Sequence, residues 1–300
     1  MNLPRIGVFD SGVGGLTVLK AVAEKVPAHY FYFGDTARLP YGTKSSETVA
    51  RYAIAAARFL EAQNIDLLVI ACNTATALAL PLIKEAAQAP VVGVVEPGAA
   101  MAAEVSKQRA AIVIATEATV SSHAYRDALQ QRGLDSYEKA CPLLVPLVEE
   151  GWIEHPVTEE VARIYLDEAM AMAPKQADVL VLACTHYPLL TPLLRRIVPA
   201  EMQIVDSAES TARLVRKMIH NEDSAVIPTD KIPSAIPSDE VVRNGGRSRS
   251  RGTSIAATMF PVDHRTFRFY VTDSVDKFKR LAARFLGRQV DNVEHVDLGG

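Results

Sequence analysis

The chain has 300 residues, of which 49% are hydrophobic, and a net charge of −3. This mildly acidic balance gives no reason to expect nucleic acid or an anionic membrane as a partner, and three cysteines are too few for a disulfide scaffold. The N-terminus "MNLPRIGVFD" lacks the apolar core of a signal peptide, and no apolar run is long enough to span a bilayer. We therefore expect a cytoplasmic protein with one large or two modest domains.

Short apolar runs, typical of buried strands, alternate along the chain with Ala- and Leu-rich segments that have helical character. Near-continuous apolar strands of this kind predict an α/β fold with mainly parallel sheets covered by helices on both faces. The predicted strands are 5–10, 29–35, 66–73, 90–96, 110–116, 179–184, 203–207, 266–272 and 294–298, and the clearest predicted helices are 47–63, 158–173 and 273–287.

Two of the predicted strands are almost copies of each other. "IDLLVIACNT" (65–74) and "ADVLVLACTH" (177–186) each end in Ala-Cys, which places Cys72 and Cys184 at matching positions, 112 residues apart. A looser match relates "VVGVVEPGAA" to "MQIVDSAEST", and a weaker one relates "IGVFDSG" to "IVIATEA". We therefore expect two similar α/β domains.

Unusual polar groups stand at the ends of these strands, where ligands bind in parallel sheets. If both thiols are to reach one ligand, the two domains must face each other across a cleft. The strand-end groups are Asp10, Asp35, Cys72, Glu96, Thr116, Cys184 and Asp206.

Residues 221–262 break the pattern, because they are rich in Pro, Ser, Gly and Arg and short of large apolar groups. Such a composition predicts a mobile surface excursion. Its arginines are most simply a solvated basic loop, so they do not require a nucleic-acid partner.

The paired thiols are the strongest chemical signal. Each of the two thiols lies at a strand end, where we expect the following helix to begin, and a cysteine at the start of a helix can have its pKa lowered. His186 lies two residues after Cys184, where it can stabilise a thiolate or exchange a proton with the thiol. The third cysteine, Cys141, does not end a repeated strand of this kind and is interpreted as structural. Two thiols on opposite faces of one carbon suit the inversion of a stereocentre: one removes a proton and the other delivers one.

Other uses of two thiols fit less well. A disulfide exchanger would have a C-x-x-C pair, which is absent, and a zinc site would need more ligands than Cys-x-His supplies. A hydrolase of the Cys-His type needs one thiol.

Three further segments point to the same cleft. "FDSGVGGLTVLK" (9–20) predicts a Gly-rich turn whose backbone N–H groups can hold a carboxylate, with Asp10 and Ser11 directed into the cleft. The loop 38–45 can close over a small ligand. After "CPLLVPLV", either Glu149 or Glu150 can enter the cleft, and the residues alone leave that choice open.

Several separate motifs resemble the glutamate racemases, cofactor-independent bacterial enzymes that make D-glutamate for peptidoglycan. These motifs are "IGVFDSGVGGLTVLK", "PYG", "ACNTATA", "CPLLVPLVEEG" and "LACTHYPLL", and the similarity covers about residues 5–220 and 264–298. It implies a first domain formed by 1–96 and 208–300, an inserted domain 97–207, and an active site between them. It also implies no cofactor and no metal, glutamate as the substrate, and a homodimer.

The resemblance assigns residues as well. It implies that Cys72 and Cys184 are the catalytic thiols and that Asp10, Glu149 and His186 have auxiliary acid–base roles. Ala115 departs from the family pattern, which has Gly there. The implied substrate-binding residues are Asp10, Ser11, Tyr41, Gly42, Asn73, Thr74, Thr119, Thr185 and His186.

Three alternatives remain open. A related racemase with the same thiols could act on aspartate or on another acidic or cyclic substrate. A protein that only binds a small anion would tolerate loss of either thiol. A pyridoxal-dependent racemase would need a Schiff-base lysine, and no lysine has a suitable frame.

Overall fold

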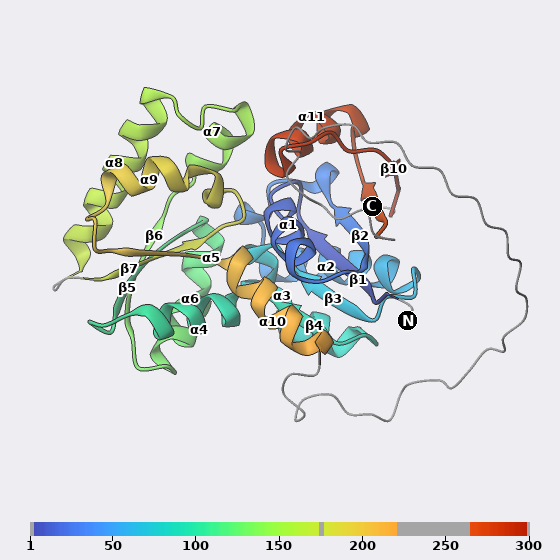
Figure 1. The fold of residues 1–300 in the computed structure, drawn as a ribbon, viewed down its shortest axis with the longest axis horizontal. Helices are drawn as coiled ribbons and strands as arrows, with labels where there is room; N and C mark the ends of the chain where they lie inside the picture. The colour runs from blue at the N-terminus through green and yellow to red at the C-terminus, as the bar shows by residue number, and fades with distance from the viewer. Residues whose placement is uncertain (1–2, 174–176, 221–264, 299–300) are drawn as a thin grey trace, which may run out of the picture.

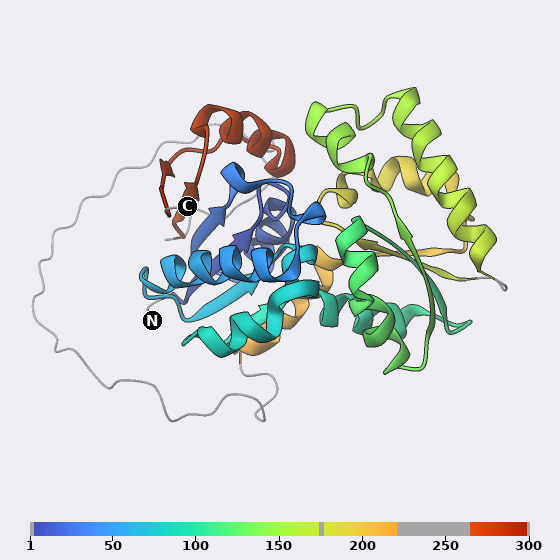
Figure 2. The same ribbon diagram turned by 180° about the vertical axis from the view of Figure 1, so that it is seen from behind.

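The computed structural model describes residues 3–173, 177–220 and 265–298. In this part of the chain two sheets of parallel strands, each covered by helices, form two lobes that lie side by side (Figures 1 and 2). We call the lobe with the six-stranded sheet the first lobe and the lobe with the four-stranded sheet the second lobe. The predicted α/β class is confirmed.

Every neighbouring pair of strands in both sheets is parallel. The central strands are buried on both sides, which is why they read as continuous apolar runs. In spatial order the first sheet contains β10 (Val293–His295), β9 (Phe267–Val271), β2 (His29–Gly34), β1 (Arg5–Asp10), β3 (Leu67–Ile70) and β4 (Val91–Gly93), and the second contains β6 (Asp135–Ala140), β5 (Ala110–Ala115), β7 (Val179–Ala183) and β8 (Gln203–Asp206).

Helices pack on both faces of each sheet through separate apolar clusters. In the first lobe, α1 (Leu16–Lys25), α10 (Ser207–His220) and α11 (Val275–Leu286) cover one face, and α2 (Ser46–Glu61) and α3 (Asn73–Ala86) cover the other. In the second lobe, α7 (Leu144–Glu150), α8 (Pro156–Met172) and α9 (Thr191–Ile197) cover one face, and α4 (Val95–Val105) and α6 (Ala124–Gln130) cover the other. The short helices η1 (Thr36–Arg38), η2 (Tyr41–Thr43), α5 (Glu117–Ser122) and η3 (Tyr187–Leu190) lie in the connections.

The internal repeat is visible in the strand order. The first sheet contains the order β2-β1-β3-β4, and the second sheet has the order β6-β5-β7-β8. Numbered within each lobe, both orders are second, first, third, fourth. The weak match between "IGVFDSG" and "IVIATEA" therefore relates β1 to β5, and the strong match relates β3 to β7.

The sequence analysis did not predict one of the strands. The segment "DSYEKA" forms β6 at the edge of the second sheet, and its residues are only partly buried. An edge strand with one exposed face carries no continuous apolar run, so the pattern that found the other strands could not find it.

The predicted domain boundaries, near residues 96 and 208, fall between the strands of the two sheets, and we propose them on that ground. The excursion predicted at 221–262 lies outside the described residues. Among the helices of the described segments, none combines the length and the apolar character needed to cross a membrane.

Phe278 of α11 packs this helix against the first sheet, and its substitution tests that packing. Its ring is 1% exposed and contacts Tyr32 and Phe269, with centroids 5.9 and 6.0 Å away. Phe278→Ala should lower the free energy of unfolding by about 3–5 kcal/mol because it leaves a cavity. Ile164→Ala, at a side chain that is 52% exposed, should change it by less than about 0.5 kcal/mol. Equal effects in a chemical denaturation experiment would contradict this packing.

Candidate active site

A cavity of about 460 Å³ lies between the lobes, where the carboxyl ends of both sheets meet. Its size is typical of a small-molecule site. It is lined by residues from both lobes: Ser11, Leu39, Pro40, Tyr41, Gly42, Thr43, Cys72, Asn73, Thr74, Thr116, Glu117, Pro142, Val145, Pro146, Glu149, Cys184, Thr185, His186 and Lys277. The two thiols of the repeated strands therefore border one cavity.

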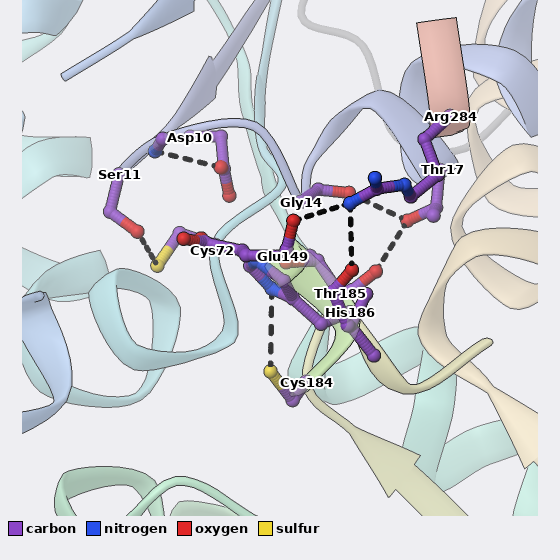
Figure 3. Close-up of polar contacts among 12 residues, drawn as sticks. Asp10, Ser11, Gly14, Thr17, Cys72, Glu149, Cys184, Thr185, His186 and Arg284 are labelled. Carbon is purple, nitrogen blue, oxygen red and sulfur yellow. Dashed lines mark hydrogen bonds and ion pairs between the residues drawn. The ribbon is translucent and has the colours of Figure 1, made fainter. Parts of the chain in front are cut away.

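Cys72 lies at the N-terminus of α3, as predicted, and its Sγ accepts a hydrogen bond from the backbone N–H of Ala75 at 3.4 Å. Its thiol also contacts Ser11 Oγ at 3.4 Å (Figure 3). Burial and the nearby carboxylate of Asp10 raise the pKa of Cys72 to about 12. The expectation that the helix terminus would lower this pKa is wrong, because desolvation outweighs the hydrogen bonds here.

Asp10 is buried behind Cys72 at the end of β1. Its Oδ2 accepts a hydrogen bond from the backbone N–H of Gly12 at 2.8 Å, so the Gly-rich turn holds this protein carboxyl group. A Cβ on Gly15 would lie 2.5 Å from the Asp10 Cβ, which explains why glycine is needed there. Burial raises the pKa of Asp10, although Gly15, His186 and other neighbours lower it.

Cys184 follows β7 and has a different partner. Its Sγ lies 3.9 Å from His186 Nδ1, and His186 Nε2 lies 3.1 Å from Glu149 Oε1 (Figure 3). The chain continues into η3 rather than directly into an α-helix, so the expected helix start at Cys184 is wrong. Glu149 lines the cavity while Glu150 is exposed, so the geometry selects Glu149 as the acid of the cleft.

The Glu149–His186 pair is charged near neutral pH. Burial acts to lower the pKa of His186, but its contacts with Cys184 and Glu149 raise it to about 10. The hydrogen bond with His186 in turn lowers the pKa of Glu149.

The two lobes meet closely at Gly14. Thr17 Oγ1 lies 2.9 and 3.0 Å from the carbonyl oxygens of Gly14 and Thr185, which share its one hydroxyl proton. A Cβ on Gly14 would lie 2.2 Å from Thr185 Oγ1 and 2.6 Å from the ring of His186. Only glycine lets the first lobe approach the Cys184 loop this closely.

Polar side chains at the N-terminus of α3 connect both lobes. Thr74 Oγ1 lies 2.9 Å from Thr116 Oγ1 and 3.3 Å from Thr119 Oγ1. Asn73 Nδ2 donates to Ser207 Oγ at 3.3 Å. The cavity thus has a wall of ordered hydroxyl and amide groups.

Most of the predicted binding residues line the cavity, with two exceptions: Asp10 and Thr119 are buried behind the lining. Tyr41 and Gly42 line it from η2, but the Tyr41 hydroxyl donates to Asp35 Oδ2 at 2.6 Å. Of the strand-end acids, Glu96 is exposed and pairs with Arg132 at 2.7 Å.

Tyr125 was missed by the sequence analysis. Its buried hydroxyl donates a hydrogen bond to Asn73 Oδ1 at 2.7 Å. This contact fixes the orientation of the Asn73 amide, so that its nitrogen is free to donate on the other side. Nothing in "SSHAYRD" distinguishes this tyrosine from a core residue, because its partner lies in the other repeat. Lys277 of α11 also lines the cavity, and it had no motif to mark it.

Metal binding has no support in the described segments, where no group of three or more His, Cys, Asp or Glu side chains is placed to hold an ion.

The His186 ring should titrate with a midpoint near pH 10, well above its ordinary value near 6.5. Because folding raises this pKa, the protonated ring stabilises the protein fully below about pH 6.5, and this contribution is lost as the pH rises through about 10. NMR of the ring nitrogens measures the midpoint. Glu149→Gln should lower it, whereas Glu150→Gln should leave it unchanged. A wild-type midpoint near 6.5 would contradict the described ion pair.

Comparison with known proteins agrees with this geometry. A family model described as Asp/Glu/Hydantoin racemase matches residues 6–215. A glutamate racemase from Koribacter versatilis is 57% identical over 298 residues, which cover 99% of this chain and 98% of that protein.

Solved structures give the same result. A glutamate racemase isoform from Bacillus anthracis superposes with a TM-score of 0.80 at 31% identity, over 98% of each chain. The glutamate racemase of Francisella tularensis in complex with D-glutamate superposes with a TM-score of 0.79 at 29% identity, over 99% of each chain. The chain therefore belongs to the Asp/Glu/Hydantoin racemase family and is an amino-acid racemase.

Proposed function

We propose that the chain interconverts L-glutamate and D-glutamate by proton transfer at the α-carbon, with one cysteine on each face of the substrate. The observation that carries this proposal is the position of Cys72 and Cys184, which come from equivalent strands of two similar sheets and border one cavity. A single thiol would need no second copy of the strand.

The surroundings of the two thiols supply complementary protonation states. The raised pKa of Cys72 keeps it a thiol, while Cys184 Sγ lies 3.9 Å from His186 Nδ1, a group that can exchange a proton with it. In one direction the Cys184 thiolate removes the α-proton and the Cys72 thiol donates its proton to the opposite face. The enzyme then holds a Cys72 thiolate and a Cys184 thiol, which is the state needed for the reverse reaction.

The cavity suits a small dicarboxylate. Ser11, Asn73, Thr74 and Thr185 offer hydroxyl and amide groups, and the N-terminus of α3 adds backbone N–H groups. The cationic side chains of the lining are few, namely His186 and Lys277. We therefore expect neutral dipoles to supply much of the carboxylate binding. The similarity of the chain, over its full length, to proteins named glutamate racemase supports glutamate rather than aspartate as the substrate.

In the cell we propose that the product D-glutamate serves peptidoglycan synthesis, as the family resemblance implies. All three cysteines are free, which supports a reducing compartment such as the cytoplasm. The homodimer stays a prediction from the resemblance.

Cys72→Ser and Cys184→Ser should each lower kcat for glutamate racemisation by about 10²–10⁴-fold, because a hydroxyl is a poor substitute for either proton-transfer group. Cys141→Ser is the matched control: Cys141 is buried and does not line the cavity, so the substitution should leave kcat nearly unchanged. Circular dichroism of the amino acid follows both directions.

The same assay with aspartate distinguishes the closest rival. Faster turnover of aspartate than of glutamate would reject the substrate assignment and keep the mechanism. Full activity of either active-site serine variant would reject the two-thiol mechanism, and equal loss in Cys141→Ser would show that the effect is structural.

A further inference from the structure

The helix α11 contacts the acid–base pair of the other lobe. It packs on the first sheet through Phe278, yet Arg284 and Phe285 near its C-terminal end reach residues of the second lobe. Figures 1 and 2 both show α11 beside α7 across the boundary between the lobes.

Arg284 binds the end of the helix that carries Glu149. Its Nη1 donates a hydrogen bond to the carbonyl of Val148 at 3.2 Å and a second, shorter one to the carbonyl of Glu149 (Figure 3). The last carbonyls of a helix have no partner within it, and a cation there also complements the helix dipole. The N–H of Gly151 already donates to the carbonyl of Val148, so Arg284 adds a second donor there and supplies one to the carbonyl of Glu149.

Gly151 makes room for this contact. It ends α7 in the left-handed conformation, with φ +86°, and a Cβ at this position would lie 2.5 Å from Arg284 Nη2. The glycine of "VEEG" thus permits both the helix end and the close approach of the guanidinium group.

The contact continues to the thiol. The Glu149 side chain holds His186 at 3.1 Å, and His186 lies 3.9 Å from Cys184 Sγ. The ring of Phe285 meets the His186 ring edge-on, with centroids 5.3 Å apart and planes at 89°. Neighbouring residues of α11 thus fix Glu149 through its backbone and His186 through its ring.

We propose that Arg284 is a positioning residue, which acts through the backbone of Glu149 to orient the Glu149–His186 pair against Cys184. The inference rests on the proposed function of Cys184. Charged or titratable groups near His186 are Cys184, Glu149 and Asp10, and Lys277 acts on Glu149; none of them is changed by a substitution at Arg284.

Arg284→Met removes the donors and keeps most of the length of the side chain. It should lower kcat for both enantiomers by about tenfold to a hundredfold, because a misplaced acid–base group costs that much, while KM changes little. The NMR midpoint of His186 should fall below its value of about 10. Arg284→Lys should restore part of both. Arg280→Met, at an exposed position of the same helix, should behave as wild type.

Wild-type kcat in Arg284→Met overturns the proposal. A lowered kcat with the His186 midpoint still near 10 also overturns it, because the loss would then come from general destabilisation. If wild-type protein does not racemise glutamate, the proposed function fails, and the His186 midpoint alone still decides whether Arg284 orients the pair.

Discussion

The proposed reaction requires two proton-transfer groups that approach one carbon from opposite sides, and the arrangement of the two lobes meets this constraint. A single parallel sheet gathers its functional side chains at one edge. Here two sheets with the same strand order turn their carboxyl edges toward one cavity, and each supplies a thiol after the equivalent strand, β3 or β7. The close contact at Gly14 and the hydroxyl groups of Thr74 and Thr116 keep these edges together.

The repeat is symmetric in its backbone and asymmetric in its chemistry. Cys72 has a buried carboxyl group, Asp10, behind it, whereas Cys184 has the imidazole of His186 beside it. In the repeat His186 occupies the place of Thr74, and Thr116 occupies the place of Asp10. Four side chains on one backbone plan thus give the two thiols different surroundings, a carboxyl group near Cys72 and an imidazole beside Cys184.

The sequence predicted the elements that carry continuous apolar runs and the thiols that end them, because burial on both faces leaves a direct pattern. It did not predict β6, whose exposed face breaks that pattern, or the raised pKa of Cys72, which depends on desolvation by residues distant in the chain. Tyr125 and Arg284 were missed for the same reason: each acts through a hydrogen bond to the other lobe, and neither has a local motif. The choice of Glu149 over Glu150 depends on which face of α7 is turned toward His186, and the sequence alone does not give that orientation.

The central claim is that each thiol serves one face of the substrate, and the location of solvent deuterium tests it most directly. L-glutamate is incubated with the enzyme in heavy water, and both enantiomers are recovered early in the reaction, before the product accumulates and reacts back. The two-thiol mechanism predicts deuterium at the α-carbon of D-glutamate and almost none in the remaining L-glutamate, because the thiol on the opposite face carries a solvent-derived deuteron. Comparable deuterium in the recovered L-glutamate would show that one group both removes and returns the proton, and would contradict the two-thiol mechanism.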